Sequence, residues 1–164
     1  MSRTRSEIAF GAALRAIDDS VPTFVYRPPD LPGPSQGKPA DFMVWGLGDA
    51  DIAPDLRGKF VDVAWFECKE LGAAVAESFP CRLVRPSQRQ GIREAMRVGI
   101  PYWLAVYWKR HKAWTISDAV RLEATGDLDR TSLQRALLNS RYGIDATPAT
   151  LTSVLKSLMA GEVS

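Results

Sequence analysis

The segment Tyr102–Trp108 constrains the fold more than any other part of the sequence, because it is apolar at every position. Successive side chains of a strand point to opposite faces of a sheet, so a strand of this kind is buried from both sides. The segment is also far shorter than the ~20 apolar residues that a membrane span requires. It therefore predicts a central strand in a sheet that is covered on both faces.

Other patterns along the chain predict the elements around this strand. Runs rich in β-branched and aromatic residues predict strands at Phe24–Tyr26, Asp41–Trp45, Lys59–Lys69 and Ala113–Ser117. Apolar residues at helical spacing predict helices at Arg3–Ile17, Ser87–Gly99 and Thr131–Ser140 and in a last segment after Thr147-Pro148. Ser87 is the expected N-cap of the second helix, and Gly99 is its expected stop. We expect residues 28–39 to be a loop, and residues 46–58 to be a connection or a protruding hairpin. The order of elements predicts an α/β fold with a mixed central sheet flanked by helices.

Length and cysteine content limit the organisation and the compartment. A chain of 164 residues is expected to form one domain over residues 1–164, with a core at about 3–117 and a C-terminal helical segment at about 118–164. The two cysteines are too few for a disulfide framework, and no signal peptide is expected at the N-terminus. The sequence therefore predicts a cytoplasmic protein without a membrane partner.

The charges are unevenly distributed, although the net charge is only +2. Residues 82–112 contain eight basic residues and one acidic residue, whereas residues 41–79 contain eight acidic and three basic residues. Such a division suits a protein that holds a polyanion together with divalent cations. Two ordinary solvated faces would give the same composition.

Candidate chemistry centres on Asp41, Glu67 and Lys69. Glu67 and Lys69 lie two residues apart on one predicted strand, so their side chains share a face about 7 Å apart. Asp41 begins another predicted strand, with 25 residues between the two acids. Two carboxylates from neighbouring strands supply the hard oxygen ligands that Mg²⁺ prefers, and a nearby lysine can orient an attacking water and offset transition-state charge. An ion pair at the sheet edge is the structural alternative.

Glu7 is a fourth candidate. It lies on the same stripe of the first predicted helix as Phe10 and Leu14. A carboxylate on a core-facing stripe is costly unless it is paired or binds a metal. The first turn of a helix is also a favourable place for an acid, because of the helix dipole.

Several motifs in this order resemble the PD-(D/E)XK nuclease superfamily, and more narrowly the RecU-type Holliday junction resolvases and their phage relatives. The motifs are Arg5-Ser6-Glu7, Pro39-Ala40-Asp41, Gly58-Lys59-Phe60-Val61-Asp62, Glu67-Cys68-Lys69-Glu70, Phe79-Pro80 before Gln88, and Val106-Tyr107-Trp108-Lys109. The chain departs from that family in the long interval before Glu67, in Ala40 before the aspartate, and in Arg85-Pro86-Ser87 before the glutamine.

The resemblance implies a restriction-endonuclease-like fold and a role for each matching residue. Asp41 and Glu67 would be metal ligands, with Glu7 a further ligand directly or through water. Lys69 would be the catalytic lysine, and Gln88 would support the site near the scissile phosphate. The metal would be Mg²⁺, with Mn²⁺ as a substitute, and the substrate would be branched DNA in a bacterial or phage-infected cell.

Basic residues supply candidate DNA contacts. Arg89, Arg93 and Arg97 recur every four residues and form one stripe of the second predicted helix. The remaining candidates for phosphate contact are Arg3, Arg5, Arg85, Lys109, Arg110 and Lys112. None of them belongs to a base-reading motif.

Three functions remain open from the sequence. The first is a metal-dependent endonuclease that resolves four-way junctions. The second is another PD-(D/E)XK DNA nuclease, of restriction or repair type, and the third is a non-catalytic DNA-binding module. Resolution of a nearly two-fold junction needs two cuts, so the first function predicts a homodimer. Its interface is expected from the aromatic strand Tyr102–Trp108 and the apolar stripe of the last helix.

Overall fold

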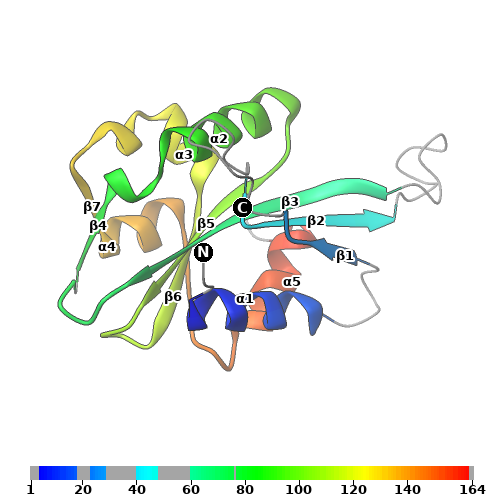
Figure 1. The fold of residues 1–164 in the computed structure, drawn as a ribbon, viewed down its shortest axis with the longest axis horizontal. Coiled ribbons are helices and arrows are strands. Elements are labelled where there is room, and N and C mark those ends of the chain that lie inside the picture. The colour runs from blue at the N-terminus through cyan, green and yellow to red at the C-terminus, as the bar shows by residue number, and fades with distance from the viewer. Residues whose placement is uncertain (1–3, 18–22, 29–39, 48–59, 76, 163–164) are drawn as a thin grey trace.

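The protein contains a six-stranded mixed sheet with helices on both of its faces, as a computed structural model shows for residues 4–17, 23–28, 40–47, 60–75 and 77–162 (Figure 1). In chain order the helices and strands are α1 (Arg5–Arg15), β1 (Thr23–Tyr26), β2 (Phe42–Leu47), β3 (Phe60–Leu71), β4 (Ser78–Pro80), α2 (Pro86–Val98), β5 (Tyr102–Trp108), β6 (Ala113–Asp118), α3 (Ala119–Ala124), β7 (Ser132–Gln134), α4 (Arg135–Leu137), β8 (Gly143–Ala146) and α5 (Leu151–Met159). The strands of the sheet follow the order β1-β2-β3-β5-β6-β8. The predicted α/β class with a mixed sheet is confirmed.

Strand β5 occupies the interior of the sheet, as its sequence predicts. It pairs in parallel with β3, with Trp65 opposite Tyr102 and Leu71 opposite Trp108, and antiparallel with β6. Five of its seven residues are buried. Among the strands that the structure describes, β3 and β5 are the only parallel neighbours, and α2 lies on the connection between them.

Two hydrophobic cores lie on opposite faces of the sheet. On one face, Ile92 and Ala95 of α2 and Leu122 of α3 pack on the sheet, and on the other face Phe10 of α1 and Leu155 of α5 do so. Figure 1 shows α2 and α3 above the sheet and α1 and α5 below it. Helices therefore cover both faces of the sheet.

Helix α2 begins and ends close to its predicted limits. Its N-cap is Arg85 and Pro86 is the first helical residue, so the prediction that Ser87 caps the helix is wrong. Proline is favoured at this position, because its missing N–H would have no helical partner there. At the other end, Gly99 adopts φ 78° and stops the helix, as predicted.

The segment after residue 118 is less helical than predicted. A helix at Thr131–Ser140 is wrong for its first half, because Ser132–Gln134 forms β7 and pairs with β4 in a second, two-stranded sheet. The helical part is α4 and one π-helical turn at Leu138–Tyr142. β8 then pairs with β6, so the last part of the chain completes the main sheet. Strands of three or four residues are too short to show a period of two.

Gly143 joins the last strand to the sheet at a place with no room for a side chain. A Cβ atom built there would lie 1.8 Å from the backbone oxygen of Ile116, in the opposing strand. We expect Gly143→Ala to lower the free energy of unfolding by about 2–4 kcal/mol, because the backbone must shift to relieve the overlap. Urea denaturation measures this, with Gly72→Ala as the control, since a Cβ at Gly72 meets nothing within 4 Å. Equal losses in the two variants would contradict the close approach.

Asp127 connects the turn after α3 to the π-helical turn through side-chain hydrogen bonds. Its carboxylate accepts hydrogen bonds from the Tyr142 hydroxyl and from Thr125 Oγ1 (3.0 Å), and it pairs with Arg130 (2.7 Å). These contacts, first of all the Tyr142 hydrogen bond, lower the pKa of Asp127 below its usual value.

A carboxyl group whose pKa is lower in the folded than in the unfolded protein stabilises the fold at pH values above its unfolded-state pKa. This contribution is lost as the pH falls through the pKa that the group has in the folded protein. We therefore expect Asp127→Asn to lose stability mainly above about pH 4, with a smaller loss below that. Urea midpoints at pH 7 and pH 3 test this. A loss that is independent of pH would contradict it.

In the part of the chain that the structure describes, every helix is too short or too polar to cross a membrane.

Candidate functional site

The alternation of side chains along β3 places its functional residues on two faces. Trp65 and Leu71 pack in the core beneath α2, while Phe66 and Cys68 pack in the core beneath α1. Glu67 accordingly faces α2, where it contacts Gln88. Lys69 reaches the same glutamine, so the prediction that Glu67 and Lys69 share one face is confirmed.

Asp41 is held beside Glu67 by the backbone of β3. The Asp41 N–H donates to the carbonyl oxygen of Phe66 (2.9 Å), and the Cys68 N–H donates to Asp41 Oδ2 (2.9 Å). These two bonds extend the pairing of β2 and β3 and point the Asp41 carboxylate at residues 66–68. Asp41 is 7% exposed, and the two predicted carboxylates converge.

Glu67 is the most deeply buried acid of the candidate site. Only 1% of its surface is exposed. Its Oε1 accepts hydrogen bonds from Lys69 Nζ (2.7 Å) and from Gln88 Nε2, whereas its buried Oε2 has no hydrogen-bond donor among the described residues. One oxygen of this carboxylate is thus fixed by Lys69 and Gln88.

The electrostatics of Glu67 follow from this burial. Desolvation raises its pKa to about 7, the charge of Lys69 acts in the opposite direction, and the charge of the neighbouring Asp41 carboxyl raises it again. A hydrogen bond between the two carboxyl groups adds to the rise. Two neighbouring carboxyl groups compete for one proton unless a cation lies between them.

Gln88 connects the carboxylates to the start of α2. Its Oε1 accepts hydrogen bonds from the Arg85 backbone N–H (2.9 Å) and from Lys69 Nζ (3.0 Å). Its amide nitrogen donates to Glu67, and the residue is 1% exposed. The structure therefore brings together four of the predicted residues, which are Asp41, Glu67, Lys69 and Gln88.

Glu7 lies near this group but is engaged elsewhere. Its Oε1 accepts hydrogen bonds from Arg27 Nη2 (2.7 Å) and Nε (3.1 Å). The Cys68 thiol, whose pKa burial raises well above its ordinary value, also feels the charges of Asp41, Glu67 and, more weakly, Glu7. Glu7 is therefore close enough to Cys68 for its charge to affect the thiol pKa, and it forms an ion pair with Arg27.

The arginine stripe of α2 is balanced by acids. Arg89 pairs with Glu123 (2.7 Å) and Asp129 (2.8 Å), and Arg93 pairs with Glu123 (2.6 Å). The third arginine, Arg97, pairs with Glu94 (2.7 Å). Glu123 and Asp129 lie outside the basic segment 82–112, so the charge of that segment in the sequence overstates the charge of this surface.

The other predicted DNA contacts lie in three places. Arg5 is exposed at the start of α1, and Arg85 is exposed at the start of α2. Lys109, Arg110 and Lys112 are exposed in the turn between β5 and β6, where Lys109 Nζ pairs with Glu70 Oε1 (2.5 Å). Arg3 lies outside the described residues.

Two residues that touch the predicted ones carry no sequence signal of their own. Arg27 follows β1 and contacts Glu7, and Glu123 pairs with the stripe of α2. Their partners are 20 and 34 residues away along the chain, so only the folded arrangement reveals them.

The donor set of the site suits a hard divalent cation. Asp41 and Glu67 contribute carboxylate oxygens, and one buried oxygen of Glu67 has no donor among the described residues. No group of three or more His, Cys, Asp or Glu side chains that could hold a metal occurs in the described ranges. Magnesium usually keeps several waters and takes only one or two protein carboxylates together with substrate phosphate, so two carboxylates fit it.

Comparison with models of known protein families and with curated protein sequences finds no match to this chain.

Proposed function

We propose that this protein is a magnesium-dependent endonuclease that resolves four-way DNA junctions by phosphodiester hydrolysis. The observation that carries the proposal is the convergence of two buried carboxylates, Asp41 and Glu67, with Lys69 at one place on the sheet. These are the residue types of the PD-(D/E)XK motif, and Glu67 and Lys69 have its Glu-x-Lys spacing. On this reading the fold is restriction-endonuclease-like and the protein acts in the cytoplasm.

Asp41 and Glu67 are the residues that would hold Mg²⁺, or Mn²⁺ in its place. Bound there, the ion would supply Lewis-acid polarisation of the scissile phosphate and a more acidic water. Glu67 Oε2 is buried and has no donor in the described part of the chain, which is the position of a carboxylate oxygen that awaits a cation. Glu7 would join through water once Arg27 releases it.

Lys69 and Gln88 have separate tasks in this proposal. The Lys69 ammonium, 2.7 Å from Glu67 Oε1, orients the attacking water and offsets the negative charge that develops on the phosphate. Gln88 fixes Lys69 and Glu67 through its carbonyl oxygen and its amide nitrogen. Because Gln88 also accepts from the Arg85 backbone, the start of α2 sets the position of the lysine.

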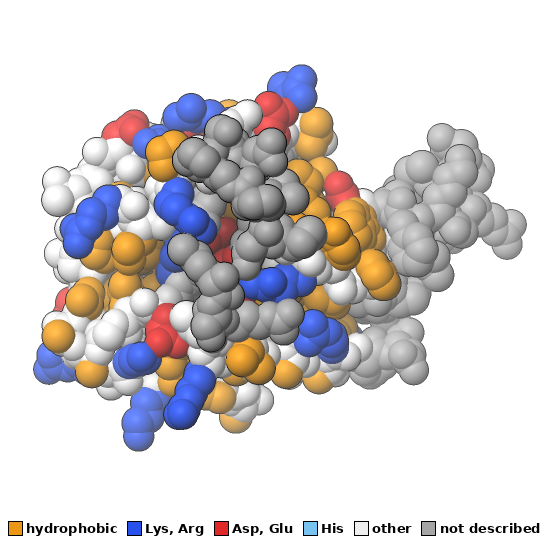
Figure 2. Space-filling view, in the orientation of Figure 1, with side chains coloured by type: hydrophobic (Ala, Val, Ile, Leu, Met, Phe, Trp, Pro, Cys, Tyr) orange, Lys and Arg blue, Asp and Glu red, His pale blue; other side chains and the backbone are white. Residues whose placement is uncertain are grey.

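The surface around the site supports a polyanionic substrate. Lys and Arg side chains are spread over the face shown in Figure 2. Arg82 and Arg85, which flank the start of α2, form no ion pair with any acid that the structure describes, in contrast to Arg89, Arg93 and Arg97. We therefore assign the phosphate contacts nearest the site to the start of α2.

The decisive experiment compares DNA substrates. We expect cleavage of a mobile four-way junction with Mg²⁺, much weaker cleavage of linear duplex and flap DNA, and none in EDTA. Light scattering should show a homodimer, since two opposed strands must be cut. Equal cleavage of junction and duplex would instead identify a nuclease of restriction or repair type.

A non-catalytic DNA-binding module is the second candidate, and one observation favours it. The Lys69–Glu67 contact of 2.7 Å is also what a buried structural ion pair shows. Junction binding without any metal-dependent cleavage would identify this module.

Arg85 provides a test of the DNA surface. If its guanidinium contacts one phosphate, Arg85→Ala should lower junction affinity and reduce the slope of log K against log salt concentration by about one. Arg121→Ala is the matched control, because Arg121 is an exposed arginine of α3 that pairs with Asp118 at 3.5 Å. An unchanged salt dependence in Arg85→Ala would show that this arginine faces solvent in the complex.

A further inference from the structure

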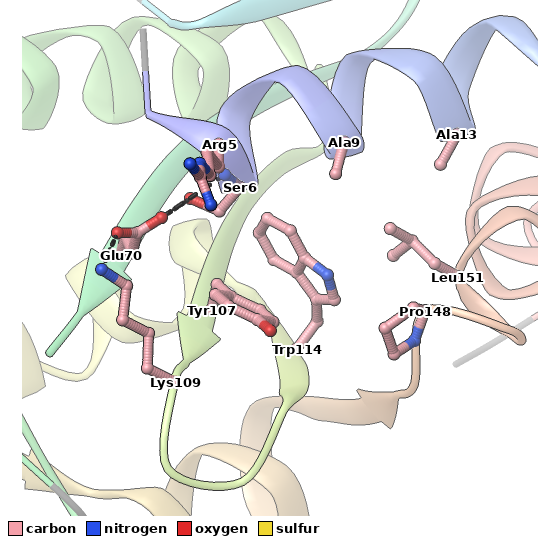
Figure 3. Close-up of a pocket in the computed structure, with 10 residues that line it drawn as sticks. All are labelled: Arg5, Ser6, Ala9, Ala13, Glu70, Tyr107, Lys109, Trp114, Pro148 and Leu151. Atoms are coloured by element: carbon pink, nitrogen blue, oxygen red, sulfur yellow. Dashed lines mark hydrogen bonds and ion pairs between the residues drawn. The ribbon is translucent and has the colours of Figure 1, made fainter. Parts of the chain in front are cut away.

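A cavity of about 680 Å³ lies on the opposite face of the sheet from Glu67 and Lys69 (Figure 3). Its walls come from the start of α1, the ends of β3 and β5, β6, and the chain around Pro148 and Leu151. Glu70 lines it, and successive residues of β3 point to opposite faces, so the cavity is separate from the carboxylate site. Its volume is that of a typical small-molecule site.

One end of the cavity is charged. Glu70 Oε2 accepts from Ser6 Oγ (2.6 Å), and Glu70 Oε1 pairs with Lys109 Nζ (2.5 Å). Both oxygens of this carboxylate are therefore engaged. Arg5 lies at the same end and has no ion-pair or hydrogen-bond partner among the described residues. Among the residues that the structure describes, this end has two cations and one carboxylate, a balance that suits an anionic group.

The middle of the cavity is aromatic. The rings of Tyr107 and Trp114 lie with centroids 5.1 Å apart at 47°. Figure 3 shows them between the charged end and Leu151 and Pro148. The Tyr107 hydroxyl forms no hydrogen bond with any described residue and is available to an acceptor atom of a ligand, whereas Trp114 is only 2% exposed and packs on Phe10 and Tyr107. Aromatic walls that also carry donors suit a flat ring with carbonyl or ring-nitrogen acceptors.

Small residues of α1 keep this space open. Ala9 and Ala13 lie one helical turn apart and line the cavity on the side of α1. A longer side chain at either position would enter the cavity.

We propose that this cavity binds one nucleotide, either free or as an unpaired nucleotide of a DNA strand. The base lies against Tyr107, which Trp114 supports from within the core, and the phosphate lies at Arg5 and Lys109. Stacking of a base on aromatic side chains contributes about 1–3 kcal/mol and tolerates any sequence. The biological use of the site rests on the proposed nuclease function, because Arg5 begins the helix that carries Glu7 and Glu70 follows Lys69 in β3. An unpaired nucleotide held here would be anchored beside the strand to be cut.

Calorimetry with thymidine 5′-monophosphate, thymidine and deoxyribose 5-phosphate in EDTA tests the site on the intact chain. We expect the nucleotide to bind at least about tenfold more tightly than either fragment, since both ends of the cavity contribute. Ala9→Leu, which fills the space, and Arg5→Ala, which removes a guanidinium from the charged end, should each weaken binding about tenfold. Arg121→Ala, on the opposite face, should bind as the wild type does. Deoxyribose 5-phosphate binding as tightly as the nucleotide would overturn the proposal, and so would no binding at all.

Competition distinguishes the two sources of the nucleotide. A single-stranded oligonucleotide that displaces thymidine 5′-monophosphate assigns the site to a nucleotide within a strand, and an oligonucleotide that does not displace it assigns the site to a free nucleotide. Junction cleavage with Mg²⁺, measured on the same preparations, keeps the two proposals apart. Cleavage by a protein that binds no nucleotide overturns the cavity proposal alone, and nucleotide binding without cleavage leaves the cavity assigned while the nuclease proposal fails.

Discussion

Glu67→Gln should cleave four-way junctions at least about a thousandfold more slowly than the wild type, and Asp41→Asn should do the same. Each change replaces a charged metal ligand by a neutral amide of the same size, and the charge stabilisation lost with the metal amounts to several kcal/mol. Single-turnover cleavage of a labelled junction in saturating Mg²⁺ measures the effect. Titration calorimetry on the same variants should show weaker metal binding.

Junction binding by these two variants should be unchanged or tighter, because one negative charge near the DNA is removed. Asp62→Asn is the matched control, since Asp62 is an exposed acid on the same strand, away from the site. A Glu67→Gln protein that cuts at the wild-type rate would refute the nuclease assignment. Loss of cleavage in all three variants would point to a general effect of charge.

The central part of the fold is predictable because long elements carry strong patterns. The apolar segment Tyr102–Trp108 is strand β5 with the predicted limits, and Gly99 ends α2 as its φ of 78° requires. The C-terminal part follows a different rule. β7 and β8 have three and four residues, and their pairing with β4 and β6 depends on segments distant in the chain. Local periodicity carries no information about such pairing.

The candidate site likewise contains contacts that follow from a local pattern and contacts that depend on distant segments of the chain. Alternation along one strand places Glu67 and Lys69 together, and this prediction needs only the strand itself. The resemblance implies only that Gln88 supports the site, and its contact with both residues depends on where α2 begins. The partner of Glu7 could not be expected, because Arg27, which follows β1, is 20 residues away along the chain.

The arginine stripe shows how charge counts along the sequence fail. Arg89 and Arg93 lie on one face of α2, as their spacing predicts, but α3 places Glu123 between them, at 2.7 and 2.6 Å. A net charge computed over a continuous segment omits acids that the fold brings in from elsewhere. Arg85 is closer in sequence to Gln88 and forms no such ion pair with a described acid, so it is the better candidate for a phosphate contact.

Lys69→Met should cleave junctions about a hundredfold or more slowly while still binding Mg²⁺. Methionine keeps an unbranched apolar side chain in the space of the lysine stem, which is 13% exposed, but removes the ammonium that lies 2.7 Å from Glu67 Oε1. A positioned charge or proton-transfer group contributes about 10²–10⁴ in rate. Calorimetry with Mg²⁺ separates this variant from Glu67→Gln, which should lose the metal.

The double variant Glu67→Gln/Lys69→Met decides whether the two residues act together. If the lysine works on a water that the metal site holds, the double variant should be about as slow as Glu67→Gln alone, because residues that act as a unit have non-additive effects. If the two contribute separately, their losses should multiply. A wild-type rate in Lys69→Met, with metal still bound, would assign the lysine to a structural ion pair and leave the carboxylates as the catalytic groups.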